Sequence, residues 1–274
     1  MGSKDMPPLA TSFWRIFLKL KFPTKNTDLS GKVVIITGGN QGLGFESARQ
    51  FLSLHLSHLI ITVRSEEKGK AAALKLQAEY PNATISVWLL DMCSYDSIQT
   101  FVKRVESELP HLDIAILNAG RSKADFELVP STGHEETLQL SYLSTILLAT
   151  LLLPILKSKS PQGTPGRLSI VSSGTALATK FSNSQQSPLL KSFDDIKASP
   201  TPGLQTYGAT KLLYYCNKRK ESHGCFIMDW EIRPFPPLLY TPKGKTTIER
   251  LWQETLDEFD FAGVQSVLES MKKN

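Results

Sequence analysis

One glycine-rich turn constrains the fold of this chain more than any other feature. The apolar run Val33 to Ile36 leads into the octet TGGNQGLG at 37–44, and an amphipathic stretch follows it. This order is typical of a strand, a tight turn and the start of a helix. Glycine permits positive φ and lets the backbone approach an anion, to which the helix start presents free N–H groups. The sequence therefore predicts a phosphate-binding turn of a dinucleotide site.

A cation stands where a second predicted strand ends, and it bears on the kind of nucleotide. Arg64 lies twenty residues after the glycine turn and follows the apolar run Leu59 to Val63, and no Asp or Glu occurs between Glu46 and Glu66. An acidic residue there would accept hydrogen bonds from the ribose of NAD, whereas a guanidinium pairs with the 2′-phosphate of NADP. The sequence favours NADP, with Lys68 as a second cation. The alternative is that both are solvated charges at a strand end.

Three further motifs follow in order along the chain. Leu89-Leu90-Asp91 ends a third predicted strand, and Leu117-Asn118-Ala119-Gly120 ends a fourth. A Tyr-x-x-x-Lys spacing, Tyr207 to Lys211, comes downstream of Val171-Ser172-Ser173. Together these motifs resemble the short-chain dehydrogenase/reductase family, and in particular fungal members of secondary metabolism. The resemblance covers about residues 30 to 215.

The resemblance implies three catalytic residues, and their chemistry is consistent with it. Tyr207 would donate a proton to the substrate, and Ser173 would hydrogen-bond the substrate oxygen as hydride moves. Lys211 would hold the nicotinamide ribose. An ammonium four residues along a helix lies on the same face as the phenol, so we expect Lys211 to lower the pKa of Tyr207. The alternative is that the Tyr-x-x-x-Lys spacing occurs by chance on a surface helix.

The resemblance also implies the residues that bind the cofactor NADP. The glycine turn would meet the pyrophosphate, the strand-end aspartate would meet the adenine ring, and the segment after the fourth strand would meet the ribose. In that order these residues are Gly38, Gly42, Leu43 and Gly44; Asp91; and Asn118, Ala119 and Gly120. An Asp after a strand also often starts a turn or caps a helix, and this remains the alternative for Asp91.

Two departures from the family pattern bear on activity. Ser141 takes the place of an Asn that in the family supports a proton-relay water, and a hydroxyl carries one donor where an amide carries two. After Lys220 the chain passes directly to a stretch that resembles the family's final strand, and no Pro-Gly pair occurs after Gly203. We infer an internal deletion of about one strand and one or two helices. It is either genuine or an exon lost from the gene model.

The alternation of predicted elements indicates a Rossmann-like, doubly wound α/β fold with a parallel sheet. One domain spans 31–274, and its C-terminal part is truncated relative to the family. We predict strands at 33–37, 58–63, 84–90, 113–118 and 167–172, and helices at 43–54, 66–79, 96–108, 132–157 and 204–216. A last strand near 224–231 should pair with the strand at 167–172 in place of the missing one. Helices near 244–258 and 261–272 follow.

Charge is concentrated at the N-terminus. The chain of 274 residues has a net charge of +5, of which residues 1–32 supply +4. The remainder of the chain is nearly neutral and has no excess of basic charge that would indicate nucleic-acid binding. The basic, aromatic extension 1–30 either makes weak contact with a membrane surface or folds back on the domain or a partner subunit. The basic residues Arg15, Lys19 and Lys21 interrupt its apolar cluster, which argues against a signal peptide.

Other features narrow the class of protein. Three scattered cysteines suggest a reducing compartment, so we expect a cytoplasmic protein, and His55 with His58 has no third ligand that would suggest a metal. The run Ile146 to Leu156 is too short to span a bilayer and contains Pro154, so we expect a buried helix. The Ser-, Gln- and Pro-rich stretch 180–206 is predicted to be a loop over the site.

Two functions remain in play. The first is an NADP-dependent oxidoreductase that interconverts a carbonyl and a secondary alcohol of a small molecule in a secondary-metabolite pathway. This function is compatible with a homo-oligomer. The second is a catalytically impaired relative, or an aberrant gene product, that retains partial nucleotide binding. Ser173, Tyr207 and Lys211 favour the first, whereas Ser141 and the missing segment favour the second.

Overall fold

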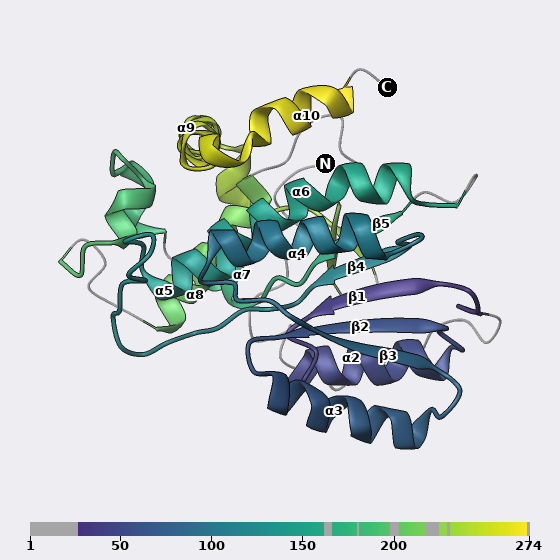
Figure 1. Ribbon diagram of the computed structural model, residues 1–274. Helices are drawn as coiled ribbons and strands as arrows, with labels where there is room; N and C mark the ends of the chain where they lie inside the picture. The colour runs from purple at the N-terminus through teal and green to yellow at the C-terminus, as the bar shows by residue number, and fades with distance from the viewer. Residues whose placement is uncertain are drawn as a thin grey trace.

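The computed structural model has one parallel sheet with helices on both faces (Figure 1). It describes residues 27–161, 166–179, 181–197, 203–216, 225–228 and 231–272. The sheet consists of β1 (Val33–Thr37), β2 (His58–Val63), β3 (Thr84–Leu89), β4 (Ile114–Leu117) and β5 (Arg167–Ile170). The longer helices that cover it are α2 (Gly42–Ser53), α3 (Glu66–Glu79), α4 (Tyr95–Glu108), α6 (Ser144–Ser158) and α8 (Leu204–Cys216).

The strand order is β3-β2-β1-β4-β5, and every neighbouring pair is parallel. The chain therefore winds outward from β1 in one direction and then returns to wind outward in the other. Because all five strands run the same way, their carboxyl ends lie at one edge of the sheet, with the reversal of direction between β1 and β4. The predicted doubly wound α/β fold is confirmed.

Strand β1 shows why the apolar runs are continuous. Val33 and Ile35 face the larger hydrophobic core, which contains residues of α4, α6 and α8, whereas Val34 and Ile36 face a second core formed with α2 and α3. Successive side chains of a strand point to opposite faces, so a strand covered on both sides has no polar face. All four of these side chains are at most 4% exposed.

The predicted helix 132–157 is interrupted in the structure. Leu128 and Glu135 form an isolated antiparallel bridge, and Gly133 has a φ of 75°, so the helix begins only at α5 (Glu136–Leu138). A π-helical turn, η2 (Gln139–Leu143), then joins α5 to α6. The combined helix Glu136–Ser158 is apolar and long enough to cross a membrane, but 83% of its most apolar 18-residue stretch is buried inside the protein, as expected of a core helix.

The segment after β5 is less regular than the first part of the chain. The short helix α7 (Thr175–Ala178) comes first, and the 3-10 turns η3 (Ser182–Gln185) and η4 (Leu190–Phe193) follow it before α8. The predicted loop 180–206 therefore contains two helical turns.

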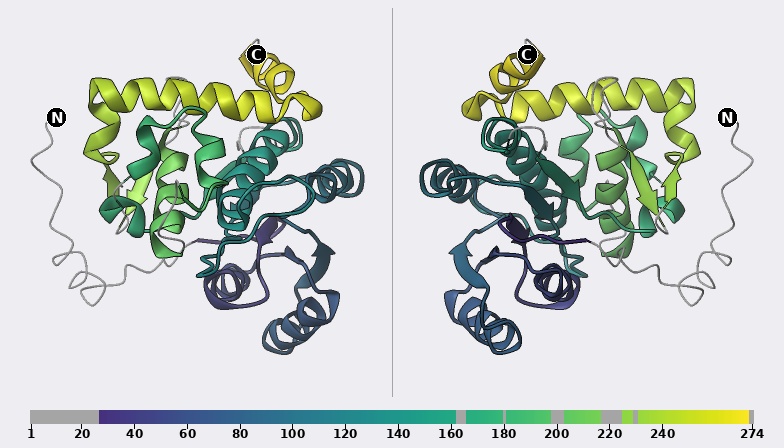
Figure 2. Two further views of the ribbon diagram at one scale, coloured as in Figure 1. Left: turned by 90° about the vertical axis from the view of Figure 1, so that its left-hand side faces the viewer. Right: turned by 90° about the vertical axis from the view of Figure 1, so that its right-hand side faces the viewer.

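The C-terminal region lies outside the parallel sheet (Figure 2). It consists of β6 (Phe226–Met228), β7 (Glu231–Arg233), the turn η5 (Pro237–Tyr240), the long helix α9 (Pro242–Glu258), the turn η6 (Asp260–Ala262) and α10 (Val264–Lys272). Helix α10 packs on α6, and α9 lies near α8 and η4. These two helices form an outer layer over the larger core.

The predicted position of the last strand is wrong. We expected one strand near 224–231 beside β5, but β6 and β7 form an antiparallel two-stranded sheet of their own, with Phe226 opposite Arg233. The Phe226 ring stacks on Phe235, 6.5 Å between centroids, and this contact holds the hairpin against the core and not against the β5 edge. Within the described residues, β5 has no strand on its outer side. The N-terminal extension lies almost entirely outside the described residues.

Candidate functional site

The predicted site residues gather at the carboxyl edge of the sheet, although they are spread over more than 170 positions of sequence. Each follows the end of a different strand or lies on a helix packed beside it. The glycine turn follows β1, Arg64 follows β2, Asp91 follows β3, Asn118 to Gly120 follow β4, and Ser173 follows β5. Parallel strands make this convergence unavoidable, and ligands of open α/β sheets bind at this edge.

The glycine turn has the backbone shape that the sequence predicts. Gly38 and Gly42 have φ angles of +66° and +55°, which side chains rarely adopt. A Cβ on Gly44 would overlap the Gly38 carbonyl oxygen and come within 2.6 Å of Asn118 Nδ2. No side chain caps the start of α2, so its N–H groups face the open edge, where Leu43 is 73% exposed. This turn can accept a pyrophosphate.

A threonine that the sequence analysis did not select organises the turn. The Thr37 hydroxyl accepts hydrogen bonds from the N–H groups of Asn118 and Ala119, each at 2.9 Å. Asn118 Nδ2 in turn donates to the Thr37 carbonyl at 3.0 Å. Asn118 therefore ties β4 to the glycine turn, and its predicted contact with ribose stays a prediction. A buried Thr at the end of a strand is the only signal that could have identified Thr37.

The charged candidates at the nucleotide end are on the surface. Arg64 and Lys68 are both exposed, on either side of the first residues of α3, whose N-cap Ser65 accepts a hydrogen bond from the Lys68 N–H. Arg64 makes no hydrogen bond or ion pair within the described part of the chain. Asp91 Oδ1 accepts a hydrogen bond from the Cys93 N–H at 2.9 Å. The side chain therefore starts a turn, which is the alternative role given for it in the sequence analysis. A contact with adenine remains a prediction.

The catalytic candidates come from two helices that pack closely. Tyr207 and Lys211 lie one turn apart on α8, and the Lys211 Nζ is 5.3 Å from the centroid of the Tyr207 ring. The Ser173 hydroxyl accepts hydrogen bonds from the N–H and hydroxyl of Thr175, at the start of α7. A Cβ on Gly208 would overlap Thr179, so this glycine lets α8 approach the end of α7, the helix that follows Ser173.

Lys211 is the most deeply buried cation of the site. Its side chain is only 2% exposed, and Nζ donates to the Val171 carbonyl at 3.1 Å. A Cβ on Gly120 would lie 3.1 Å from the same Nζ, so the missing side chain leaves room for the ammonium. Burial lowers the pKa of Lys211 to about 8.

The predicted electrostatics of the tyrosine are wrong in direction. We expected the ammonium to lower the pKa of Tyr207, but burial of the phenol raises this pKa. The Lys211 Nζ lies 5.3 Å from the ring centroid and donates to a main-chain carbonyl. Burial therefore dominates for both groups: it favours the neutral phenol and the neutral amine.

Ser141 lies in the π-helical turn and contacts the strand-end segment. Its hydroxyl donates to the Arg121 carbonyl at 3.2 Å and is 3.3 Å from the Arg121 N–H, which donates to it. The Arg121 side chain pairs with Glu136, which also pairs with Lys123. Ser141 thus fixes the backbone that follows Gly120.

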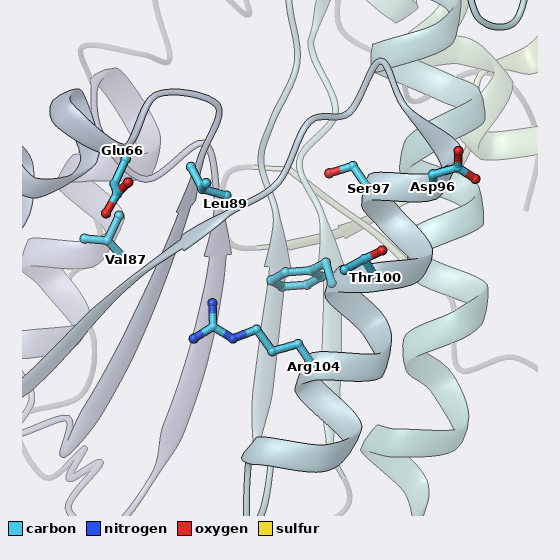
Figure 3. A pocket seen from close by; sticks show the side chains of 8 residues that line it. Glu66, Val87, Leu89, Asp96, Ser97, Thr100 and Arg104 are labelled. Atoms are coloured by element: carbon cyan, nitrogen blue, oxygen red, sulfur yellow. The ribbon is translucent and has the colours of Figure 1, made fainter.

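A separate cavity of about 560 Å³ lies between the edge strand β3 and the helix α4 (Figure 3). Its lining comes from β3, the start of α3 and α4, and includes Leu89, Thr100 and Arg104. None of the predicted catalytic or cofactor-binding residues lines it. The convergent edge of the sheet, and not this cavity, carries the chemistry of the candidate site.

Sequence comparison agrees with the geometry. Residues 32–185 match the family described as short chain dehydrogenase. The short chain dehydrogenase/reductase mfmJ of Annulohypoxylon moriforme is 46% identical, with all of both chains aligned. The short chain dehydrogenase virL of Hypocrea virens is 35% identical, over 95% of this chain and 94% of the relative.

Solved structures share the fold at lower identity. A short chain dehydrogenase from Salmonella enterica superposes with a TM-score of 0.52 at 20% identity, covering 70% of each chain. An NADPH-dependent 3-quinuclidinone reductase from Rhodotorula rubra gives a TM-score of 0.51 at 19% identity, covering 73% of this chain and 69% of the reductase. At such identities the likeness concerns the fold alone.

The alignment with the Annulohypoxylon protein also bears on the predicted deletion. It runs over 343 positions, whereas this chain has 274 residues, so 343 minus 274, or 69, positions have no counterpart here. The relative is therefore the longer of the two chains, and a single deletion after Lys220 stays a prediction.

Proposed function

Because the chain belongs to the short-chain dehydrogenase/reductase family, we propose that it interconverts a carbonyl and a secondary alcohol of a small molecule with NADP as cofactor. One observation carries the proposal. The Lys211 ammonium is buried between Gly120 and the Val171 carbonyl, on the same helix face as Tyr207. A buried lysine with a shifted pKa, beside a tyrosine at the edge where ligands of parallel sheets bind, is a candidate functional group.

In the proposed mechanism each side chain acts on the substrate oxygen or beside it. Burial keeps the Tyr207 phenol protonated at neutral pH, which is the form that donates a proton to a carbonyl oxygen. The Ser173 hydroxyl hydrogen-bonds the same oxygen and stabilises its developing negative charge. Lys211 would hold the ribose of the cofactor next to the tyrosine. A bound reduced nicotinamide would supply the hydride, and with the proton from Tyr207 the ketone would become the alcohol.

The preference for NADP rests on Arg64. This side chain is exposed at the end of β2 and makes no hydrogen bond or ion pair within the described residues, although its charge is among those that lower the pKa of Glu136. A guanidinium can form a bidentate pair with a phosphate. The glycine turn and the uncapped start of α2 fit the pyrophosphate, and their shape depends on the missing Cβ atoms of Gly38, Gly42 and Gly44.

The biological setting is proposed from the fungal relatives. We place the reaction in a secondary-metabolite pathway, as the resemblance to fungal members implies. A catalytically impaired relative is the second candidate. It is favoured by the β5 edge, which lacks a further strand in the described residues, and by the Ser141 hydroxyl, which is engaged with the Arg121 backbone.

A two-part experiment tests the proposal. Titration calorimetry with NADPH and NADH measures cofactor binding, and oxidation of NADPH is then followed with a panel of ketones. Binding with ketone-dependent oxidation, abolished in Tyr207→Phe, is the result expected of the reductase. Binding of NADPH without turnover of any ketone is the result expected of the impaired relative, and no binding of either nucleotide contradicts both.

A further inference from the structure

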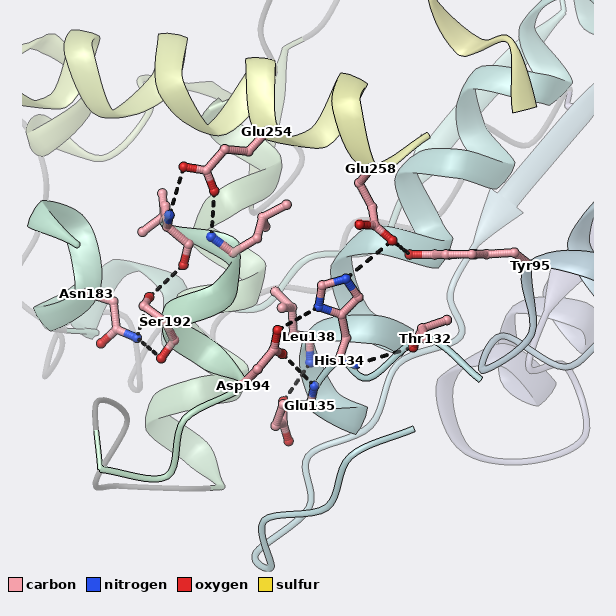
Figure 4. A network of polar contacts seen from close by, with 12 residues as sticks. Tyr95, Thr132, His134, Glu135, Leu138, Asn183, Ser192, Asp194, Glu254 and Glu258 are labelled. Atoms are coloured by element: carbon pink, nitrogen blue, oxygen red, sulfur yellow. Dashed lines mark hydrogen bonds and ion pairs between the residues drawn. The ribbon is translucent and has the colours of Figure 1, made fainter. Parts of the chain in front are cut away.

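A polar network joins the C-terminal helix α9 to the loop 181–197, which runs between Ser173 and Tyr207 (Figure 4). Both oxygens of the Glu254 carboxylate accept main-chain hydrogen bonds, from the Leu189 N–H at 2.8 Å and the Leu190 N–H at 2.7 Å. These N–H groups belong to the start of η4, where the first donors of a helical turn lack partners of their own. The glutamate of α9 thus caps a turn of the loop.

Two more side chains of α9 hold the other half of the loop. Arg250 Nη2 donates to the Ser184 carbonyl at 2.6 Å, and the Thr247 hydroxyl, whose shorter hydrogen bond goes to the Lys243 carbonyl at 2.9 Å, lies 3.3 Å from the same Ser184 oxygen. With Glu254, these contacts recur every three to four residues, so one face of α9 follows the loop. The loop is therefore fixed by a helix more than fifty residues further along the chain.

His134 is the third point of attachment. Its Nδ1 lies 2.9 Å from Asp194 Oδ2, at the end of the loop turn, and its Nε2 lies 3.3 Å from Glu258 Oε1, at the end of α9. Only 7% of its side chain is exposed. Asp194 also accepts from the Glu135 N–H at 2.9 Å. The imidazole therefore bridges the loop and α9, and it adjoins the helix that carries Ser141.

The groups that face His134 favour its charged form. Burial disfavours the imidazolium, but hydrogen bonds and attraction from Asp194 and Glu258 outweigh this effect and raise the pKa of His134 to about 9. Tyr95 donates to the same Glu258 oxygen at 3.0 Å, Lys191 is the nearby cation that favours the Glu258 carboxylate, and the adjacent Glu135 is buried.

The sign of the pH effect follows from the raised pKa. An ordinary histidine, as in the unfolded chain, loses its proton near pH 6.5. The stabilising contribution of the charged bridge is therefore complete below about pH 6.5 and is lost as the pH rises through about 9. Above that pH two carboxylates would face each other across a neutral ring.

We propose that His134, Glu254 and Glu258 are positioning residues that hold the loop 181–197 against helix α9. This attachment, here called the strap, requires the positive charge of His134. Opening of the strap frees the segment between Ser173 and Tyr207 while the parallel sheet stays folded. The loop would then be ordered at neutral pH and loosened in alkali. This proposal concerns loop order and does not depend on whether the chain turns over a substrate.

Hydrogen exchange followed by mass spectrometry tests it on the full chain. Protection factors, which remove the intrinsic pH dependence of exchange, are measured for peptides covering 181–197 between pH 7 and 10, with β1 and β2 as the internal reference. In the wild-type chain we expect protection of the loop to fall by at least about tenfold over this range, whereas the reference strands change little. In His134→Gln the loop should be exposed already at pH 7 and its protection should no longer depend on pH.

Glu249→Gln is the matched control, because Glu249 is exposed on the same helix and makes none of the strap contacts. It should behave as the wild type, whereas Glu254→Gln should lose loop protection at pH 7 and keep His134 in place. If His134→Gln fails to fold, Glu254→Gln and the wild-type pH series decide the question. Equal loop protection in Glu254→Gln and Glu249→Gln, or a wild-type loop whose protection is the same at pH 7 and 10, would overturn the proposal.

Discussion

Different contacts stabilise the nucleotide-binding side of the sheet and the C-terminal region. Strand β1 has a parallel neighbour on each edge and a hydrophobic core on each face. Within the described residues, β6 and β7 pair only with each other, and the cross-strand pair Ile227 and Ile232 is 61% and 75% exposed. Burial on two faces stabilises the parallel sheet at β1, whereas the hairpin β6–β7 is stabilised by contacts of the residues that flank its strands.

This difference bears on the predicted deletion after Lys220. Each strand from β1 to β4 finds its place through a local crossover with its own helix, so it does not depend on the C-terminal third of the chain. The hairpin β6–β7 follows α8 in the chain but does not pair with β5. Helix α9 is instead anchored on the loop 181–197 and on η2, where the Tyr142 and Thr255 hydroxyls are 2.9 Å apart, and α10 packs on α6.

The largest expected effect tests whether the altered C-terminal region still supports catalysis. Tyr207→Phe removes only the phenolic hydroxyl, and we expect turnover of any accepted ketone to fall by about 10²- to 10⁴-fold, because a positioned proton donor is lost. NADPH affinity should stay within about twofold, since the ring still packs. Initial rates and titration calorimetry on the same preparations measure both quantities.

Tyr240→Phe is the matched control for this experiment. Tyr240 is 57% exposed, next to the hairpin, and its hydroxyl accepts from the Phe235 N–H. Its loss should leave turnover unchanged. A Tyr207→Phe rate equal to that of the wild type would show that another group donates the proton.

A second prediction concerns the burial contrast itself. Ile35→Ala, in a strand covered on both faces, should destabilise the chain by about 2–5 kcal/mol, because it leaves a cavity in a packed core. Ile232→Ala removes the same atoms from a side chain that is 75% exposed, and we expect a loss of less than about 1 kcal/mol. Urea unfolding with a common slope measures both values. Similar losses at the two sites would mean that the hairpin is buried against a further surface in solution.

The sequence sufficed for the parallel sheet because its signals are local. Apolar runs, the glycine turn and capping serines such as Ser65 and Ser94 define each βα unit without reference to distant residues. The last strand could not be placed in the same way. Its neighbour in the sheet is decided by which edge is available and by what holds the segment elsewhere, here the contact between Phe226 and Phe235.

The sequence indicated which positions form the candidate site better than it indicated their protonation and contacts. Parallel topology brought the strand-end motifs together as expected. Burial was not visible in the sequence, and it reverses the expected direction of the Tyr207 pKa. The roles of Thr37 and Gly208 depend on contacts between segments 80 and 30 residues apart, which no local pattern contains. The π-helical turn at Ser141 likewise fell inside the single helix predicted for 132–157.

The third prediction sharpens the comparison at the nucleotide end. Arg64→Asp should weaken NADPH binding by about 1.5–3 kcal/mol, or roughly 10- to 150-fold, because an Arg–phosphate pair is replaced by repulsion, and NADH should be affected far less. Arg167→Asp makes the same charge change at the opposite, amino-terminal end of β5, where Arg167 is exposed, and should not alter the ratio. Equal dissociation constants for the two cofactors in the wild type would contradict a role for Arg64 in choosing between them.

The smallest expected effect joins the two regions through Lys211. Because burial lowers its pKa to about 8, the ammonium is present below that pH and is lost as the pH rises through it. A dinucleotide that binds the ammonium should therefore bind less tightly as the pH increases from 7 to 9, by up to about tenfold, since one pKa unit corresponds to a factor of ten. Lys211→Met should bind more weakly at pH 7 and show no such slope, whereas Lys157→Met, an exposed lysine at the end of α6, should follow the wild type. If the wild-type dissociation constant is flat over this range while that of Lys211→Met is already weaker, the lysine acts by its shape and hydrogen bonds and not by its charge. If both are flat and equal, the buried lysine does not contact the cofactor, and the C-terminal rearrangement has separated the nicotinamide end of the site from the nucleotide end.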